Sequence, residues 1–111
     1  MRRYSYQKKI DSILENVNYN NTIVIRNLIQ YCFVYDFKDP ADSAIRLDLE
    51  YTIYDSNILS TKQLIVVHNH LVRDINQMAI AKGLRISQQR VSEILLTSLE
   101  VLVEYWRNFY E

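Results

Sequence analysis

The chain has 111 residues, a formal net charge of zero from 13 basic and 13 acidic side chains, and 49% apolar residues. This length suits one domain with one core, and the apolar content excludes a disordered chain. A single glycine and a single proline leave few turn residues for tight β-hairpins, so the composition predicts helices. The single cysteine excludes an intramolecular disulfide framework and a multi-cysteine zinc site.

The sequence also indicates where in the cell the protein is expected and how strongly its charge favours binding to nucleic acid. Arg2 and Arg3 are not followed by the apolar run of a signal peptide, and apolar stretches such as residues 64–67 are far shorter than a membrane span. We therefore expect a soluble, cytoplasmic protein with no membrane partner. Zero net charge does not support strong non-specific binding to nucleic acid, but it is compatible with a local basic face.

Two helices are predicted before residue 40. Residues 5–17 carry apolar side chains at the i, i+3, i+4, i+7 spacing of an amphipathic helix. Residues 21–37 are more apolar and predict a second helix, with a strand as the alternative for residues 22–26 because of their β-branched side chains. We expect this second helix to pack against the apolar last helix of the chain; the alternative is that the last helix exposes an apolar stripe that docks a second copy or a polymerase surface.

Two further helices have recognisable start signals. Asp39 and Pro40 are suited to the N-cap and the first position of a helix that runs to about Tyr54. Ser60 and Gln63 have the spacing of a capping box, which predicts the start of the next helix.

The last two helices are predicted to be adjacent. Asp74, with Gln77 three residues later, predicts the cap of a short helix that stops near Gly83, and Ser87 predicts the cap of a helix that runs to about Tyr110. We expect an all-α protein: one compact helical domain over residues 1–111, with about six helices, a C-terminal helix-turn-helix and a long last helix.

The predicted helix-turn-helix is the candidate functional site. Its second helix begins with polar side chains, and Gln, Arg and Glu can hydrogen-bond adenine, guanine and cytosine in the DNA major groove. Residues 61–92 hold five basic side chains against Asp74 alone, a local charge of +4. We call the outward-facing residues of the second helix the recognition set: Gln88, Gln89, Arg90, Ser92 and Glu93.

The same segment resembles a known family. The strings LSTKQ at 59–63, AIAKGLRISQQRVSEIL at 79–95 and SLEVL at 98–102 are similar in order and spacing to region 4 of bacterial RNA polymerase sigma factors. LDLE at 47–50 resembles the lead-in of small sigma-like regulators of phages and prophages. The resemblance covers residues 45–106, and residues 1–40 form an N-terminal helical extension outside it.

The resemblance implies a transcription regulator, such as a phage or prophage activator, that works with host RNA polymerase. The recognition set would read a promoter element in double-stranded DNA, and the region would hold the β-subunit flap of the polymerase. Arg73, Lys82 and Arg85 are the candidates for phosphate contacts on chemical grounds. A second copy of the chain is a further candidate partner, and no cofactor is implied.

The chain departs from the family pattern at several positions. Ala79 stands where the family has a glutamate, and Arg85 stands where it has a turn glycine. Thr97, Glu100 and Val103 replace basic residues of the later recognition helix, which removes phosphate contacts. These departures favour the alternative function, a protein-interaction module that binds polymerase or another regulator with little DNA contact.

An enzyme is not expected. His68 and His70 are two residues apart on a predicted helix and so face different sides, which excludes their joint use as metal ligands. Cys32 lies in an apolar run, as a buried inert thiol does. Neither catalytic nor metal-binding residues are therefore assigned.

Overall fold

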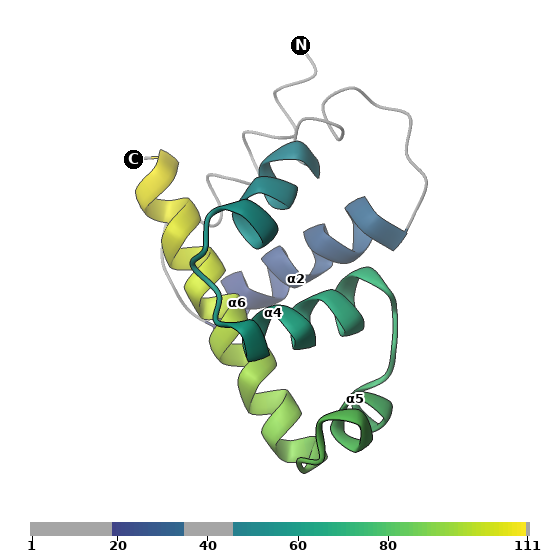
Figure 1. The fold of residues 1–111 in the computed structure, drawn as a ribbon. Helices are drawn as coiled ribbons and strands as arrows, with labels where there is room; N and C mark the ends of the chain where they lie inside the picture. Colours follow the sequence, from purple (N-terminus) through teal and green to yellow (C-terminus); the bar gives the residue numbers. More distant parts are fainter. Residues whose placement is uncertain (1–18, 35–45, 111) are drawn as a thin grey trace.

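The computed structural model describes residues 19–34 and 46–110, and these residues are helical or connect helices, with no strand among them. The all-α prediction is confirmed. The described part has five helical segments against the expected total of about six, while the predicted helix 5–17 and the caps Asp39 and Pro40 lie outside it. The segments are α2 (Tyr19–Val34), residues 46–50 continued by η1 (Tyr51–Asp55), α4 (Thr61–Val67) continued by η2 (His68–Val72), α5 (Gln77–Leu84) and α6 (Gln88–Tyr110) (Figure 1).

Helix α2 settles the choice between strand and helix at residues 22–26 in favour of the helix. Its buried apolar residues Ile25, Leu28, Ile29 and Cys32 are spaced i, i+3, i+4, i+7, so they form one face. That face packs against α6 and η2, which confirms the predicted pairing of the second and last helices.

Two wide turns were not expected from the sequence. In η1 the Ser56 N–H donates to the Tyr51 carbonyl at 2.9 Å, and in η2 the Arg73 N–H donates to the His68 carbonyl at 3.0 Å. Both bonds span five residues instead of four, which defines a π turn. The Tyr54 hydroxyl lies 2.7 Å from His68 Nδ1, so a side-chain hydrogen bond joins the two wide turns. Burial, and secondarily the Glu50 charge, raise the pKa of Tyr54 above its ordinary value.

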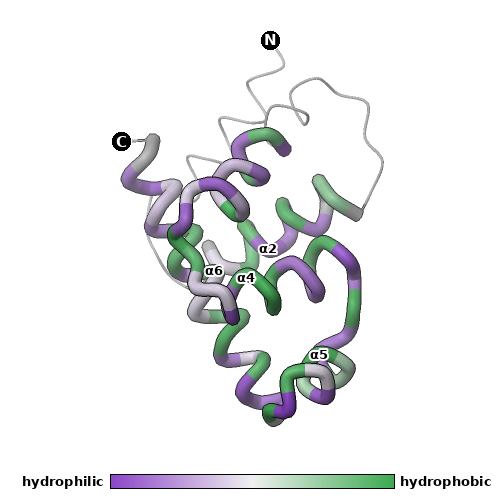
Figure 2. Tube along the Cα trace, in the orientation of Figure 1, coloured by the Kyte–Doolittle hydropathy of each residue, from purple (hydrophilic) through white to green (hydrophobic). Residues whose placement is uncertain are grey.

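The core is built around α6, which contacts α2, α4, α5 and η1 (Figure 1). Hydrophobic and hydrophilic residues alternate along this helix (Figure 2). Trp106 lies almost fully buried near its end, and its indole N–H donates to Thr52 Oγ1 at 2.9 Å. This bond ties α6 to η1. The inward face of α6 consists of Val91, Ile94, Leu95, Ser98, Leu99, Leu102, Val103 and Trp106.

The helix caps give one confirmation and one correction. Ser60 and Gln63 form the predicted capping box, with each side chain bonded to the other residue's backbone N–H. The predicted Asp74 cap is wrong: Asn76 caps α5 by accepting from the Ala79 N–H at 2.9 Å. The wide turn of η2 carries the preceding helix to Val72, and Asp74 takes a left-handed backbone conformation with φ 59° in the connection that follows. Within the described ranges, no helix has both the length and the hydropathy needed to cross a membrane.

Candidate DNA-binding surface

A short corner joins α5 to α6 and positions the candidate site. The Ile86 N–H donates to the Ala81 carbonyl at 3.1 Å, and the Arg85 N–H donates to the Lys82 carbonyl at 3.3 Å. These two bonds form a Schellman motif, in which the residue after the helix is left-handed and is usually glycine. Here that residue is Arg85, with φ 58° and ψ 44°. The only glycine of the chain, Gly83, lies inside α5, where it adopts no positive φ.

Buried residues hold the two helices of this corner together. Ala81 on α5 and Val91 and Ile94 on α6 are buried in the common core. Ser87 Oγ accepts the Arg90 N–H at 3.0 Å, which confirms the predicted cap of α6. Figure 1 shows that α5 and the start of α6 lie at one end of the molecule, away from residues 46–55 and the end of α6.

Four members of the recognition set point away from the core. Gln88, Gln89, Arg90 and Glu93 are all exposed at the first turns of α6. Arg90 and Glu93 form a surface ion pair at 3.3 Å, with their side chains 57% and 54% exposed. An exposed pair of this kind contributes about 0–1 kcal/mol, so Arg90 can exchange Glu93 for a phosphate or a base at little cost.

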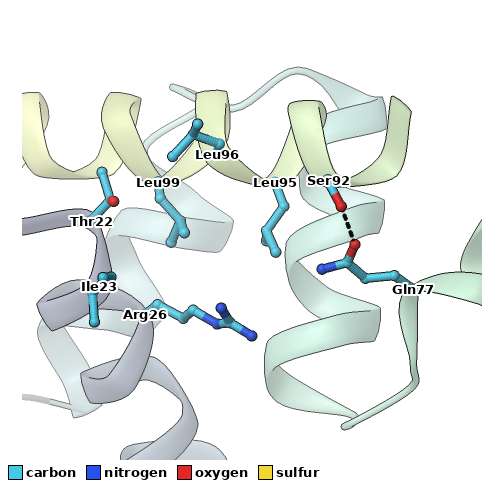
Figure 3. Close-up of a pocket in the computed structure, with 8 residues that line it drawn as sticks. All are labelled: Thr22, Ile23, Arg26, Gln77, Ser92, Leu95, Leu96 and Leu99. Atoms are coloured by element: carbon cyan, nitrogen blue, oxygen red, sulfur yellow. Dashed lines mark hydrogen bonds between the residues drawn. The ribbon is translucent and has the colours of Figure 1, made fainter. Parts of the chain in front are cut away.

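Ser92, the fifth member, is placed differently. It is exposed, but its hydroxyl donates to Gln77 Oε1 on α5, as Figure 3 shows. The hydroxyl therefore joins α5 to α6. Ser92 is thus the one member of the recognition set whose side chain is bonded to α5.

The predicted phosphate contacts divide into two groups. Lys82 and Arg85 are exposed at the end of α5, beside the start of α6. Arg73 is also exposed, but it follows η2 and hydrogen-bonds Asn69 at 3.2 Å. Arg73 precedes α5 in the chain, whereas the corner follows α5. The corner itself therefore carries three exposed cations, Lys82, Arg85 and Arg90.

Further along α6 the exposed face is acidic. Glu93, Glu100 and Glu104 are exposed on the side opposite the core, together with Leu96 and Thr97. Arg90 is the one basic residue between Ser87 and Glu104. This face would repel the phosphates of a DNA duplex laid along it, which leaves only the first turns of the helix suited to a contact with DNA.

Sequence reasoning missed a pocket beside this corner. It has a volume of about 260 Å³ and is lined by residues of α2, α5 and α6 (Figure 3). Arg26 of α2 is the main polar group of its wall, and its Nε is buried without a hydrogen-bond acceptor among the described residues. One signal was present in the sequence: Arg26 is the only charged residue in the apolar segment that forms α2.

A second, more apolar groove of about 210 Å³ lies between the end of α4, η2 and α5. Its lining residues are Ile65, Asn69, Ile75, Ala79, Ile80, Gly83 and Leu84. Ile65 is 37% exposed there, which is high for an isoleucine on a core helix.

The two histidines and the cysteine, to which the sequence analysis assigned no catalytic role, lie in structural surroundings. His68 contacts Tyr54, while His70 Nδ1 donates to the Ile75 carbonyl at 2.8 Å, so the two rings serve different contacts. Cys32 is buried. Among the described residues, no group of three or more His, Cys, Asp or Glu side chains is arranged to hold a metal ion.

The fold and this surface define an all-α protein with a C-terminal helix-turn-helix. Comparisons of the chain with protein-family models, with curated proteins and with solved structures found no significant match.

Proposed function

We propose that the chain is a sequence-specific DNA-binding transcription regulator that acts like region 4 of a sigma factor. The α5–α6 corner carries this proposal. It presents exposed Gln88, Gln89 and Arg90 at a helix N-terminus, with Lys82 and Arg85 beside them. A helix start with these side chains has the chemistry to enter a major groove: the glutamines can bind adenine and the arginine can bind guanine or a phosphate.

In this proposal the protein is a phage or prophage activator in the cytoplasm of a bacterial host. It binds promoter DNA together with host RNA polymerase and takes the β-subunit flap as its protein partner. The acidic face of α6 supports shared binding with polymerase. The corner offers three cations for phosphates, which corresponds to a salt slope of about −2.7, too shallow for tight autonomous binding at working salt.

Sequencing of genomic fragments retained by the purified chain, with and without bacterial core polymerase, tests this proposal. We expect one enriched motif when polymerase is present. The double variant Gln89→Ala, Arg90→Ala should lose the motif, with at least about tenfold weaker retention, because a bidentate base contact contributes about 1–3 kcal/mol of discrimination. Lys62→Ala, which removes an exposed charge from the start of α4, is the matched control and should retain the motif.

The result of the sequencing experiment distinguishes binding as a homodimer from binding together with polymerase. A palindromic motif enriched by the chain alone would indicate a DNA-binding homodimer. Retention of the motif by the double variant would overturn the assignment of the recognition set.

The second candidate is a protein-interaction module with little DNA contact. Two observations favour it: the acidic outer face of α6, with Glu93, Glu100 and Glu104, and the apolar groove between η2 and α5. Polymerase binding that needs no DNA and persists at high salt would support this candidate, because apolar contacts are screened far less than phosphate contacts.

A further inference from the structure

We propose that the pocket between α2, α5 and α6 binds a small amphipathic carboxylate, with the carboxylate on Arg26 and the apolar chain against α6. This proposal goes beyond the proposed function: it concerns a small-molecule ligand, and its charged residue, Arg26, belongs to α2, outside the segment that resembles sigma factors.

The polar groups of the pocket favour an anion. The guanidinium of Arg26 points into the pocket, and Gln77 directs its amide nitrogen toward the same space (Figure 3). The Gln77 oxygen is engaged by the Ser92 hydroxyl, so the amide offers N–H donors to the pocket. Two donors, one of them cationic, match a carboxylate, because Arg binds this planar group with two parallel hydrogen bonds.

The remaining wall favours an apolar chain. Leu95 and Leu99 form the floor on α6, and Ile23 and Leu96 lie at the rim, each 38% exposed. A volume of about 260 Å³ is just under the range of about 300–1,000 Å³ typical of drug-sized ligands, so the occupant is a small molecule. The cation in an apolar wall therefore selects an acid with a short hydrocarbon chain over a bare anion.

One atom of Arg26, its Nε, has no hydrogen-bond partner in the described part of the chain. This atom is buried, although a buried donor of a charged group is costly to leave unpaired. Among the residues that the structure describes, no carboxylate side chain lines the pocket. A bound carboxylate would supply the missing negative charge.

Octanoate is the probe, titrated into the full chain without DNA and followed by NMR. We expect saturable shifts confined to Leu95, Leu99 and the Gln77 side-chain amide, with a dissociation constant below about 1 mM, a free energy of about −4 kcal/mol. 1-Octanol and inorganic phosphate are titrated into the unmodified protein as control ligands, so their affinities can be compared with that of octanoate without any variant. Each should bind at least about tenfold more weakly, because each lacks one half of the recognised chemistry.

Variants then assign the charge to Arg26. Arg26→Gln should weaken octanoate binding at least about tenfold, Arg26→Lys should weaken it less, and the charge-matched control Lys62→Gln should leave it unchanged. Equal binding of octanol and octanoate, unchanged affinity in Arg26→Gln, or no shifts at 5 mM octanoate, about five times the expected dissociation constant, would each overturn the proposal.

Discussion

The two ends of α6 have the same backbone and opposite surroundings. At its start, Gln88, Gln89 and Arg90 are exposed, and a short corner links them to α5. At its end, Trp106 is buried and hydrogen-bonded to Thr52. The start of α6 thus presents polar side chains to solvent, while the same helix is anchored in the core at its end, so its exposed polar start does not lack support.

The largest expected effect is at the anchored end. Trp106→Ala should lower the free energy of unfolding by about 3–5 kcal/mol, because it empties a large buried volume and removes the hydrogen bond to Thr52. Urea denaturation followed by circular dichroism measures this loss. Trp106→Phe, which keeps most of the apolar volume, should lose less. A loss under about 1 kcal/mol in Trp106→Ala would contradict the proposed anchoring.

The cap at the exposed end should have a smaller effect on stability and a specific effect on binding. Ser87→Ala removes the acceptor for the Arg90 N–H and should cost about 1 kcal/mol of stability. It should also weaken DNA retention, because the first turn of α6 carries the recognition set. Ser60→Ala at the start of α4 is the matched control: we expect a similar thermal destabilisation with unchanged retention. Equal effects of both variants on DNA would refute the local role of the α6 start.

One substitution in the α5–α6 corner should raise stability and weaken DNA binding at the same time. Arg85→Gly relieves a left-handed backbone conformation and should raise stability by up to about 1 kcal/mol, while the loss of the proposed phosphate contact should reduce the salt slope by about 0.9. Gly83→Ala is the control, since, apart from its chain neighbours and the adjacent backbone of α5 itself, no atom lies within 4 Å of the added Cβ. It should stabilise α5 by about 0.5–1 kcal/mol and leave the slope unchanged. Thermal unfolding and DNA titrations at several salt concentrations test both variants.

The smallest expected effect is a pH dependence at Tyr54 in η1, the segment that Trp106 contacts through Thr52. Since the pKa of Tyr54 is raised in the folded state, its contribution to stability is present below the unfolded pKa of about 10 and is lost as the pH rises through the folded pKa. Tyr54→Phe, which loses the bond to His68, should be less stable than the unmodified protein at pH 8, and this difference should shrink by pH 11. Urea midpoints at the two pH values measure the change. A constant difference would contradict the pKa direction.

Short-range patterns predicted the parts of the fold that depend on neighbouring residues. The apolar spacing in α2 and the caps at Ser60 and Ser87 were correct, because the atoms involved lie within one helical turn. Asp74 and Asn76 are both good capping residues, and only the wide turn before them selects Asn76.

The candidate site was predictable in part. The exposure of Gln88, Gln89, Arg90 and Glu93 followed from the helix period. The bond between Ser92 and Gln77, which are 15 residues apart, depends on the crossing of two helices and has no local signal. The same holds for the pocket, where Arg26 meets residues of α6 nearly 70 positions later.

The two wide turns, η1 and η2, are sites where the deletion of a single residue would leave a regular helix. Each holds one residue more than an ordinary helical turn, which is equivalent to an insertion absorbed within a helix instead of a loop. Removal of one residue there would restore the regular helical repeat and rotate the following residues by about 100° around the axis. The hydrogen bond between Tyr54 and His68 connects both turns. A deletion in one turn would therefore displace its partner side chain from the other turn.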